Sequence, residues 1–324
     1  MWKTFLRRLI ILVPQLIGVS LLIFLLAELM PGDALSGHFR EDPTMTQAQI
    51  DALRIQYGLY GPWYTRYITW VGNMLTGDFG TSLTHRRPVV ELVGERMGNT
   101  VLLSTISVLI IYSFALPLGI IAGRHKGKTP EKIITFYNFI QMAIPMVVFA
   151  LVLQWVFAIG FGIFPLRGSV DVNVINQGST LDIFISRIHH ALLPALSMSL
   201  LAGVGIIQFL ANEINDQKEL DYVTTARSKG VPLKDIYKRH VFRNSLLPIA
   251  ANFGPVVVGL FGGAVIIENM FTYNGMGRLF VMSISGQDWP VVNFLVIFYG
   301  ALTILGFLLS DIALTVFDPR IRIK

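Results

Sequence analysis

The residues between Asp221 and Pro248 have the types and spacing of a rigid helix–turn–helix with a basic surface rather than of a catalytic site. Asp221 to Lys229 predicts a short helix, and Gly230 is suited to end it because glycine adopts positive φ at little cost. Pro232 stands where a second helix would begin. The apolar positions of that second helix share one face, and Lys and Arg occupy the others. They are Leu233, Ile236, Tyr237, His240 and Val241.

Such an element can do one of two things at a membrane surface. A basic amphipathic helix can lie on anionic lipid, or a rigid helix–turn–helix can dock a cytoplasmic protein. A loop that only joined two spans would need no such structure. Periodicity alone leaves both interpretations open.

The sequence offers little to an enzyme or a cofactor. It has no cysteine, no GxxxxGK[ST] phosphate loop and no HExxH zinc motif. The adjacent His189 and His190 would diverge on a helix, so they are better read as interface residues than as metal ligands. We therefore expect no catalytic residue, no metal and no cofactor, and no binding of ATP by this chain itself.

The segment that contains this helix–turn–helix, residues 214–247, is called the docking loop below. The elements that must position it are membrane helices. Of the 324 residues 53% are hydrophobic and 14% charged, and the mean hydropathy is +0.60, whereas globular proteins carry about 25% charged residues. Apolar runs long enough to span a bilayer as helices, about 20 residues, occur six times. They are Leu9–Met30, Thr100–Gly123, Ile133–Phe164, His190–Ala211, Leu246–Met270 and Val291–Phe317.

Positive charge alternates between the connecting segments. The two ends of the chain, Arg124–Lys132 and residues 214–247 hold 17 of the 26 Lys and Arg residues. The positive-inside rule places these segments in the cytoplasm. The expected protein is therefore an all-α, multi-pass protein of the bacterial inner or plasma membrane with both termini cytoplasmic. Its predicted parts are residues 1–30, an external segment 31–99, a core 100–317 with the loop 214–247, and a tail 318–324.

The external segment is predicted to form a helical insertion between the first two spans. Thr46 to Gln49 has a capping-box pattern, and Ile50, Leu53 and Tyr57 follow at helical spacing before Gly58. Pro62 can open a second helix. Its face of Trp63, Tyr67, Trp70 and Val71 would anchor at the membrane interface or dock an external partner.

Several motifs together resemble one transporter family. Thr225–Gly230 followed by Asn244–Pro248 is similar to the EAA loop of ABC importer permeases, in the version of the dipeptide/oligopeptide/nickel family. Gly77–Ser82, Asn99-Thr100, Glu268–Leu279 and Asp318–Arg320 resemble further motifs of that family, first-permease (B-type) subunits, in order along the chain. The chain departs from the family pattern in two places. Its loop begins Thr225-Ala226 instead of Glu-Ala-Ala, and it has Asn274 where members of the family often have Pro.

The resemblance implies a fold and a mechanism. It implies a type I ABC importer permease with six transmembrane helices, forming half of a pathway for dipeptides or oligopeptides. The implied partners are a second homologous permease, two cytoplasmic ATPases and an external solute-binding protein, and no nucleic acid. According to the resemblance, six residues couple this chain to the ATPases. They are Asp221, Thr225, Ala226, Arg227, Lys229 and Gly230.

Polar residues and glycines within the spans are candidates for the pathway, because polar groups are costly in lipid. They are Gln141, Asn252, Gly262, Gly263 and Glu268. Structural roles are favoured for each: hydrogen bonding between helices, close helix approach, or solvation of Glu268 near a span end.

Other functions remain open at this point. Nickel chelates or other small solutes use similar permeases. An ion-coupled secondary transporter would show inverted repeats and midplane ionisable groups, and an intramembrane enzyme would need a nucleophile–base pair or metal ligands. We find none of these patterns in the sequence.

Overall fold

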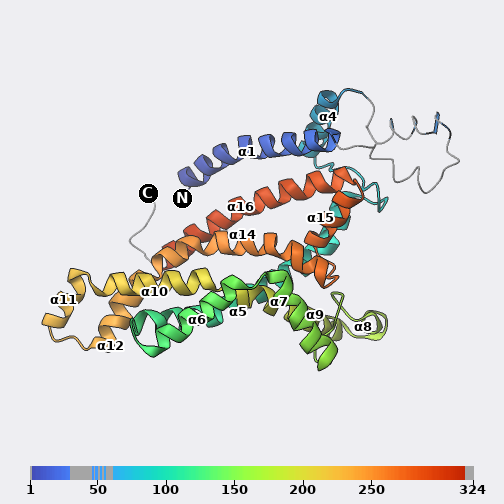
Figure 1. Cartoon of the computed structure of the whole chain (residues 1–324). Coiled ribbons are helices and arrows are strands. Elements are labelled where there is room, and N and C mark those ends of the chain that lie inside the picture. Colours follow the sequence, from blue (N-terminus) through green and yellow to red (C-terminus); the bar gives the residue numbers. More distant parts are fainter. Residues whose placement is uncertain are drawn as a thin grey trace. The chain divides into compact units, whose positions relative to one another are not determined.

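The computed structural model describes residues 2–29, positions 46, 48, 49, 52 and 55, and residues 61–317 (Figure 1). These residues are mostly helical, with one isolated antiparallel bridge between Thr81 and Pro88. They form two compact units. The first comprises residues 1–98 and 275–304, and the second residues 99–274 and 305–324. Residues 61–98 thus group with Gly275–Ile304.

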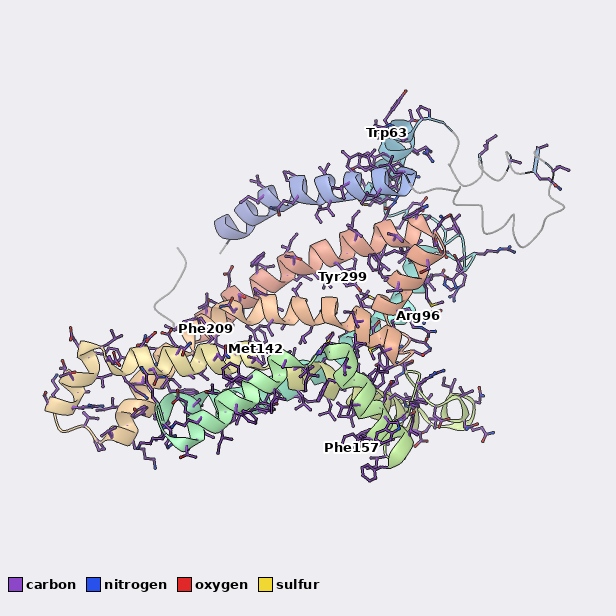
Figure 2. The ribbon with its side chains drawn as sticks, in the orientation of Figure 1. Trp63, Arg96, Met142, Phe157, Phe209 and Tyr299 are labelled. Atoms are coloured by element: carbon purple, nitrogen blue, oxygen red, sulfur yellow. The ribbon has the colours of Figure 1, made fainter. Side chains whose placement is uncertain are left out.

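In the first unit the predicted external helix is present as α4 (Trp63–Leu75), with Pro62 at its N-cap. Its Tyr67 packs edge-on against Phe24 of α1 (Trp2–Leu29) and shares a 2.9 Å hydrogen bond with Ser20. Trp63, labelled in Figure 2, is 39% exposed. The Thr46 backbone N–H donates to Gln49 Oε1 at 2.8 Å, as the capping box predicts, whereas Tyr57 and Gly58 lie outside the described residues.

A buried carboxylate organises the rest of this unit. Asp288, directly before α16 (Trp289–Phe317), is fully buried and accepts hydrogen bonds from Ser82 Oγ at 2.5 Å and from the backbone N–H groups of Leu83 and Thr84 at 3.0 and 3.2 Å. Three donors on one carboxylate make strong, charge-assisted hydrogen bonds. The loop that follows Gly77 is thereby fixed to the turn between α15 (Met276–Ser285) and α16.

The second unit is a bundle of helices around one apolar core. Most of α5 (Val89–Arg124), together with α10 (Val204–Lys218) and α14 (Leu247–Met270), packs on that core. Figure 1 shows α11 and α12 at one end of this unit and α8 (Val172–Gln177) at the other. α11 and α12 therefore lie at the opposite end of the bundle from α8.

The third predicted span, Ile133–Phe164, is not one straight helix. α6 (Thr129–Ala143) meets α7 (Met146–Leu153) and the π-helix η1 (Gln154–Gly160) at an angle of 99°. Pro145 lies at the break, with Ile144 extended before it. Proline has no N–H and disfavours helical geometry in the preceding residue, so the helix ends there.

The fourth predicted span, His190–Ala211, also differs from the structure. A capping box between Ser179 and Asp182 starts α9 (Thr180–Ala202) ten residues earlier than expected. A second helix, α10, follows a break at Gly203 and continues to Lys218. The expected loop from Ile214 is therefore helical in its first residues.

Four described helices are long and apolar enough to cross a membrane: Val89–Arg124, Thr180–Ala202, Phe242–Met270 and Trp289–Thr315. The bent pair of α6 with α7 and η1 can supply a fifth. α1 is the remaining predicted span, and its described apolar stretch Val13–Leu26 is shorter. The predicted all-helical, multi-pass architecture is confirmed.

The closest helix contact in the second unit is between α14 and α16. A Cβ on Gly254 would collide with the backbone carbonyl of Gly306, and the Gly254 N–H donates to Ser310 Oγ at 2.9 Å. Gly259, further along α14, has nothing within 4 Å of such a Cβ. Small residues allow this backbone approach in a membrane protein.

We predict that Gly254→Ala destabilises the protein by about 1–3 kcal/mol, because the helices must move apart to admit the methyl group. Gly259→Ala is the matched control on the same helix. Thermal unfolding in detergent measures the difference. Equal melting temperatures for the two variants would contradict this packing.

Candidate functional site

Helix α11 (Asp221–Ser228) is the short helix predicted before Gly230. Its inner face is anchored, because the Val223 side chain is 2% exposed and Ala226 packs on the same core. Tyr222 Oη donates to Gln217 Oε1 at 2.7 Å, which ties α11 to the end of α10. The core and α10 therefore hold α11 from one side.

Gly230 closes α11 in the way that the sequence predicts. Its φ is +73°, a conformation that L side chains rarely adopt. The Gly230 N–H donates to Arg227 O at 2.9 Å and the Val231 N–H to Ala226 O at 3.2 Å. These two bonds form a Schellman motif, which satisfies carbonyls that the helix end would leave unpaired.

The outer surface of this turn is polar and open. Asp221, Thr225, Arg227, Lys229 and Gly230 are exposed. A Cβ on Gly230 would meet nothing within 4 Å, so its positive φ, not crowding, is what requires glycine. The structure thus brings the six predicted coupling residues into one helix and its cap, with Ala226 alone turned toward the core.

The second half of the loop is a continuous helical path. α12 (Leu233–Ile236) runs into the π-helix η2 (Tyr237–Val241) and then α13 (Phe242–Ser245), one residue before α14. Ile236 and Val241 are buried as predicted, whereas Leu233 is 57% exposed. Nothing is described of the His240 side chain. α12, η2 and α13 thus connect the turn at Gly230 to α14.

One cavity in the second unit contains a predicted pathway residue. Asn252 on α14 lies with Tyr112 of α5 and Phe209 of α10 around a space of about 360 Å³. Asn252 is exposed and its Nδ2 donates to Pro248 O at 3.0 Å. The buried Tyr112 hydroxyl has no hydrogen-bond partner among the described residues. Phe209 is labelled in Figure 2.

The other pathway candidates are dispersed. Gln141 is buried and its Nε2 donates to Leu200 O of α9, so it joins two helices rather than facing a cavity. Gly262 is exposed on α14, where an added Cβ would meet nothing within 4 Å. Gly263 follows it on the same helix. The structure does not gather these residues with Asn252 into one site.

Glu268 is held in a buried polar cluster and not, as expected, solvated at a span end. Its side chain is fully buried, and Thr100 Oγ1 donates to Glu268 Oε1 at 2.6 Å. Beside it, Tyr273 Oη donates to Asn99 O at 3.2 Å, and Asn99 Nδ2 donates to Asn274 O at 2.8 Å. These bonds join α5 to the turn after α14.

Sequence reasoning missed Thr100 as the hydrogen-bond partner of Glu268, and it missed the neighbouring bonds of Asn99 and Tyr273. All three lie within segments that it singled out, Asn99-Thr100 and Glu268–Leu279, but their pairing across about 170 residues leaves no local pattern. Asn274 takes part through its backbone carbonyl. The contact therefore does not depend on the Asn274 side chain, at the position where the family often has Pro.

These features define a multi-pass helical membrane protein with an exposed, capped helix, α11, at one end of its second unit. The family described as "Binding-protein-dependent transport system inner membrane component" matches residues 115–323. The chain belongs to this family and is a permease subunit of an ABC importer. Membership implies, in general, a partner permease, ATPase subunits and a solute-binding protein.

Similar proteins extend over almost the whole chain. The oligopeptide transport system permease protein AppB of Bacillus subtilis is 34% identical, over 98% of each chain. The dipeptide transport system permease protein DppB of Lactococcus lactis is 28% identical over all of both chains. The glutathione transport system permease protein GsiC of Salmonella typhi is 28% identical over 98% of each.

A solved structure supports the fold. Inward-facing structures of the MetNI methionine ABC transporter include a chain that matches with a TM-score of 0.52 at 13% identity. The match covers 71% of this chain and 97% of that chain. This confirms the expected type I importer permease fold.

We predict that Thr100→Val destabilises the protein by about 1.5–3 kcal/mol, because it removes a buried hydrogen bond to a carboxylate. Thr105→Val is the control on the same helix, since Thr105 is exposed and bonds only to Val101 O. Thermal unfolding in detergent should separate the two variants. If both unfold at the wild-type temperature, the Thr100–Glu268 contact is not stabilising.

Proposed function

We propose that this permease forms half of a peptide translocation pathway and receives mechanical work from a cytoplasmic ATPase through α11. ATP binds and is hydrolysed on the partner subunits, and this chain carries no catalytic residue, metal or cofactor. The observation that carries the proposal is the exposed, Schellman-capped helix α11, anchored on its inner face by Val223.

A coupling element must be stiff, reachable and joined to a membrane helix. α11 is reachable on its polar outer face, through Asp221, Thr225, Arg227 and Lys229. Its stiffness follows from the two cap bonds at Gly230 and from the Tyr222–Gln217 hydrogen bond. The helical path from α12 to α14 supplies the connection. This favours docking of an ATPase over the lipid-surface interpretation for the outer face of α11.

Charge supports a cytoplasmic location for this loop and for both termini. The predicted cytoplasmic segments carry most of the Lys and Arg residues. The external solute-binding protein would then meet the opposite side, which includes α4 and the loop fixed by Asp288. A second, homologous permease would complete the pathway.

Peptides are the proposed substrate class because the similar proteins are named for oligopeptide, dipeptide and glutathione transport. The cavity beside Asn252 is consistent with such a substrate. Its wall is apolar except for the Asn252 amide and the Tyr112 hydroxyl, so few groups would discriminate between side chains. Selectivity would then belong to the solute-binding protein.

We predict that Gly230→Val abolishes substrate-stimulated ATP hydrolysis while the assembled complex still reaches the membrane. Valine at φ +73° is strained by about 1–2 kcal/mol, so the cap would rearrange and the docking surface would shift. The measurement is ATPase activity of the reconstituted complex with and without loaded binding protein.

Gly127→Val is the matched control for that experiment. Gly127 has φ +78° and nothing within 4 Å of an added Cβ, and it lies in the other basic loop, which is also predicted to be cytoplasmic. Its backbone strain is similar but it is remote in sequence from α11. Equal loss of stimulation in both variants, or none in Gly230→Val, would count against coupling through α11.

We also predict that Asn252→Trp slows uptake at least tenfold, because the indole would fill much of the cavity of about 360 Å³. Ala251→Trp is the control, since Ala251 is exposed on the same helix and does not line the cavity. Uptake of a radiolabelled dipeptide, a labelled oligopeptide and a labelled nickel chelate by proteoliposomes is measured for both. Uptake of the nickel chelate but of neither peptide would overturn the assignment of peptides as the substrate.

A further inference from the structure

A second cavity lies at the docking-loop end of the larger unit. It has a volume of about 230 Å³ and is formed by the end of α5, the end of α10 and the path from α12 to α13. Arg124, Lys234 and Lys238 line it together with Tyr237. None of these four residues is among those to which the resemblance assigns coupling, so the cavity needs its own explanation.

The floor of this cavity is apolar. Ile214 and Val241 are 2% and 0% exposed, and Ile120 and Phe242 complete the wall. An apolar floor beneath a cationic rim favours an amphipathic ligand, since burial of hydrocarbon is favourable while the charged heads of Lys and Arg stay near water.

The rim carries positive charge without carboxylate partners. Arg124 and Lys218 both lie over the Tyr237 ring, with 5.2 and 5.7 Å between their charged groups and the ring centroid. Lys218 Nζ donates to two neutral acceptors, Gly123 O and Asn215 Oδ1. In the part of the chain that the structure describes, no ion pair involves Arg124, Lys218, Lys234 or Lys238.

The electrostatics of Lys218 reflect this excess of positive charge. Burial first, and then the nearby charges of Lys126 and Arg124, lower the pKa of Lys218 below its usual range. Glu131 and Glu219 oppose this effect more weakly, and Glu131 already accepts a 2.5 Å hydrogen bond from the Gly127 N–H. An added anion would relieve the repulsion among these cations.

Two candidate membrane spans end at the wall of the cavity. Arg124 is the last residue of the candidate span Val89–Arg124, and Phe242 is the first residue of the candidate span Phe242–Met270. A lipid beside these two helix ends can place its headgroup at the charged rim. Basic pockets between membrane helices bind anionic lipid headgroups.

From this geometry we infer that the cavity is a binding site for one anionic phospholipid. Arg124, Lys234 and Lys238 contact its phosphate, and the acyl chains lie against Ile120 and Phe242. An acidic protein segment would match the cations but would leave the apolar floor unfilled. This site is distinct from the outer face of α11 and does not depend on the proposed peptide substrate.

The test uses the purified transporter complex in nanodiscs of equal parts phosphatidylglycerol and phosphatidylcholine. Lipids retained after transfer to detergent are counted by native mass spectrometry. The wild-type complex should retain phosphatidylglycerol preferentially. Lys234→Gln combined with Lys238→Gln should reduce that preference by about fivefold for each lysine, from the attraction of one surface cation for anionic lipid.

Two matched variants separate specific from general charge effects. Lys128→Gln with Lys132→Gln removes the same charge from exposed positions that do not line the cavity, so it should keep the wild-type preference. Lys234→Arg with Lys238→Arg keeps the charge and should also retain it. Equal preference in the double glutamine variant and the wild type would overturn the proposal.

Two further arms identify the source of the anion. Millimolar inorganic phosphate that displaced phosphatidylglycerol would show a site for a soluble anion instead of a lipid. Lipid retained by the permease pair but lost when the ATPase subunits bind would show that an ATPase surface covers the cavity. Either result would overturn the proposal, whereas retention in both arms supports it.

Discussion

The absence of water from the bilayer core constrains every part of this chain. Each backbone N–H and C=O group within the hydrocarbon must be satisfied by a helix or by neighbouring protein. The breaks in the helices are therefore informative. Those at Pro145 and Gly203 lie beside packed helices, and that at Gly230 lies in a basic loop. The Schellman bonds at Gly230 then satisfy the end of α11 without any partner.

The same constraint explains how buried carboxylates are used. Asp288 and Glu268 are both fully buried, and each accepts hydrogen bonds from a different segment of the chain. A buried charge is tolerated only when it is well hydrogen-bonded. Each carboxylate thereby fixes a turn: Asp288 fixes the loop after Gly77, and Glu268 fixes the end of α14 against α5. Rigid turns leave the helices between them as the parts that can transmit movement.

Sequence patterns predicted what is local. Gly230, Pro232 and the apolar positions of α12 follow from helix-end chemistry and periodicity, which depend on neighbouring residues. The 99° bend at Pro145 and the early start of α9 at Ser179 had local signals too, but long apolar runs concealed them. The Thr100–Glu268 and Ser82–Asp288 contacts could not be predicted, because no periodicity relates residues so far apart.

The surface of α11 and the cationic cavity both involve the segment between α10 and α14. In the proposed mechanism α11 presents its polar surface to an ATPase, and the path from α12 to α13 forms part of the wall of the cationic cavity. A ligand that neutralises Lys234 and Lys238 would remove repulsion within the same path that connects α11 to α14. Differential binding to one arrangement of that path shifts its population by the difference in binding free energy. Lipid composition would thus act on coupling through the geometry of α12, without touching the peptide pathway.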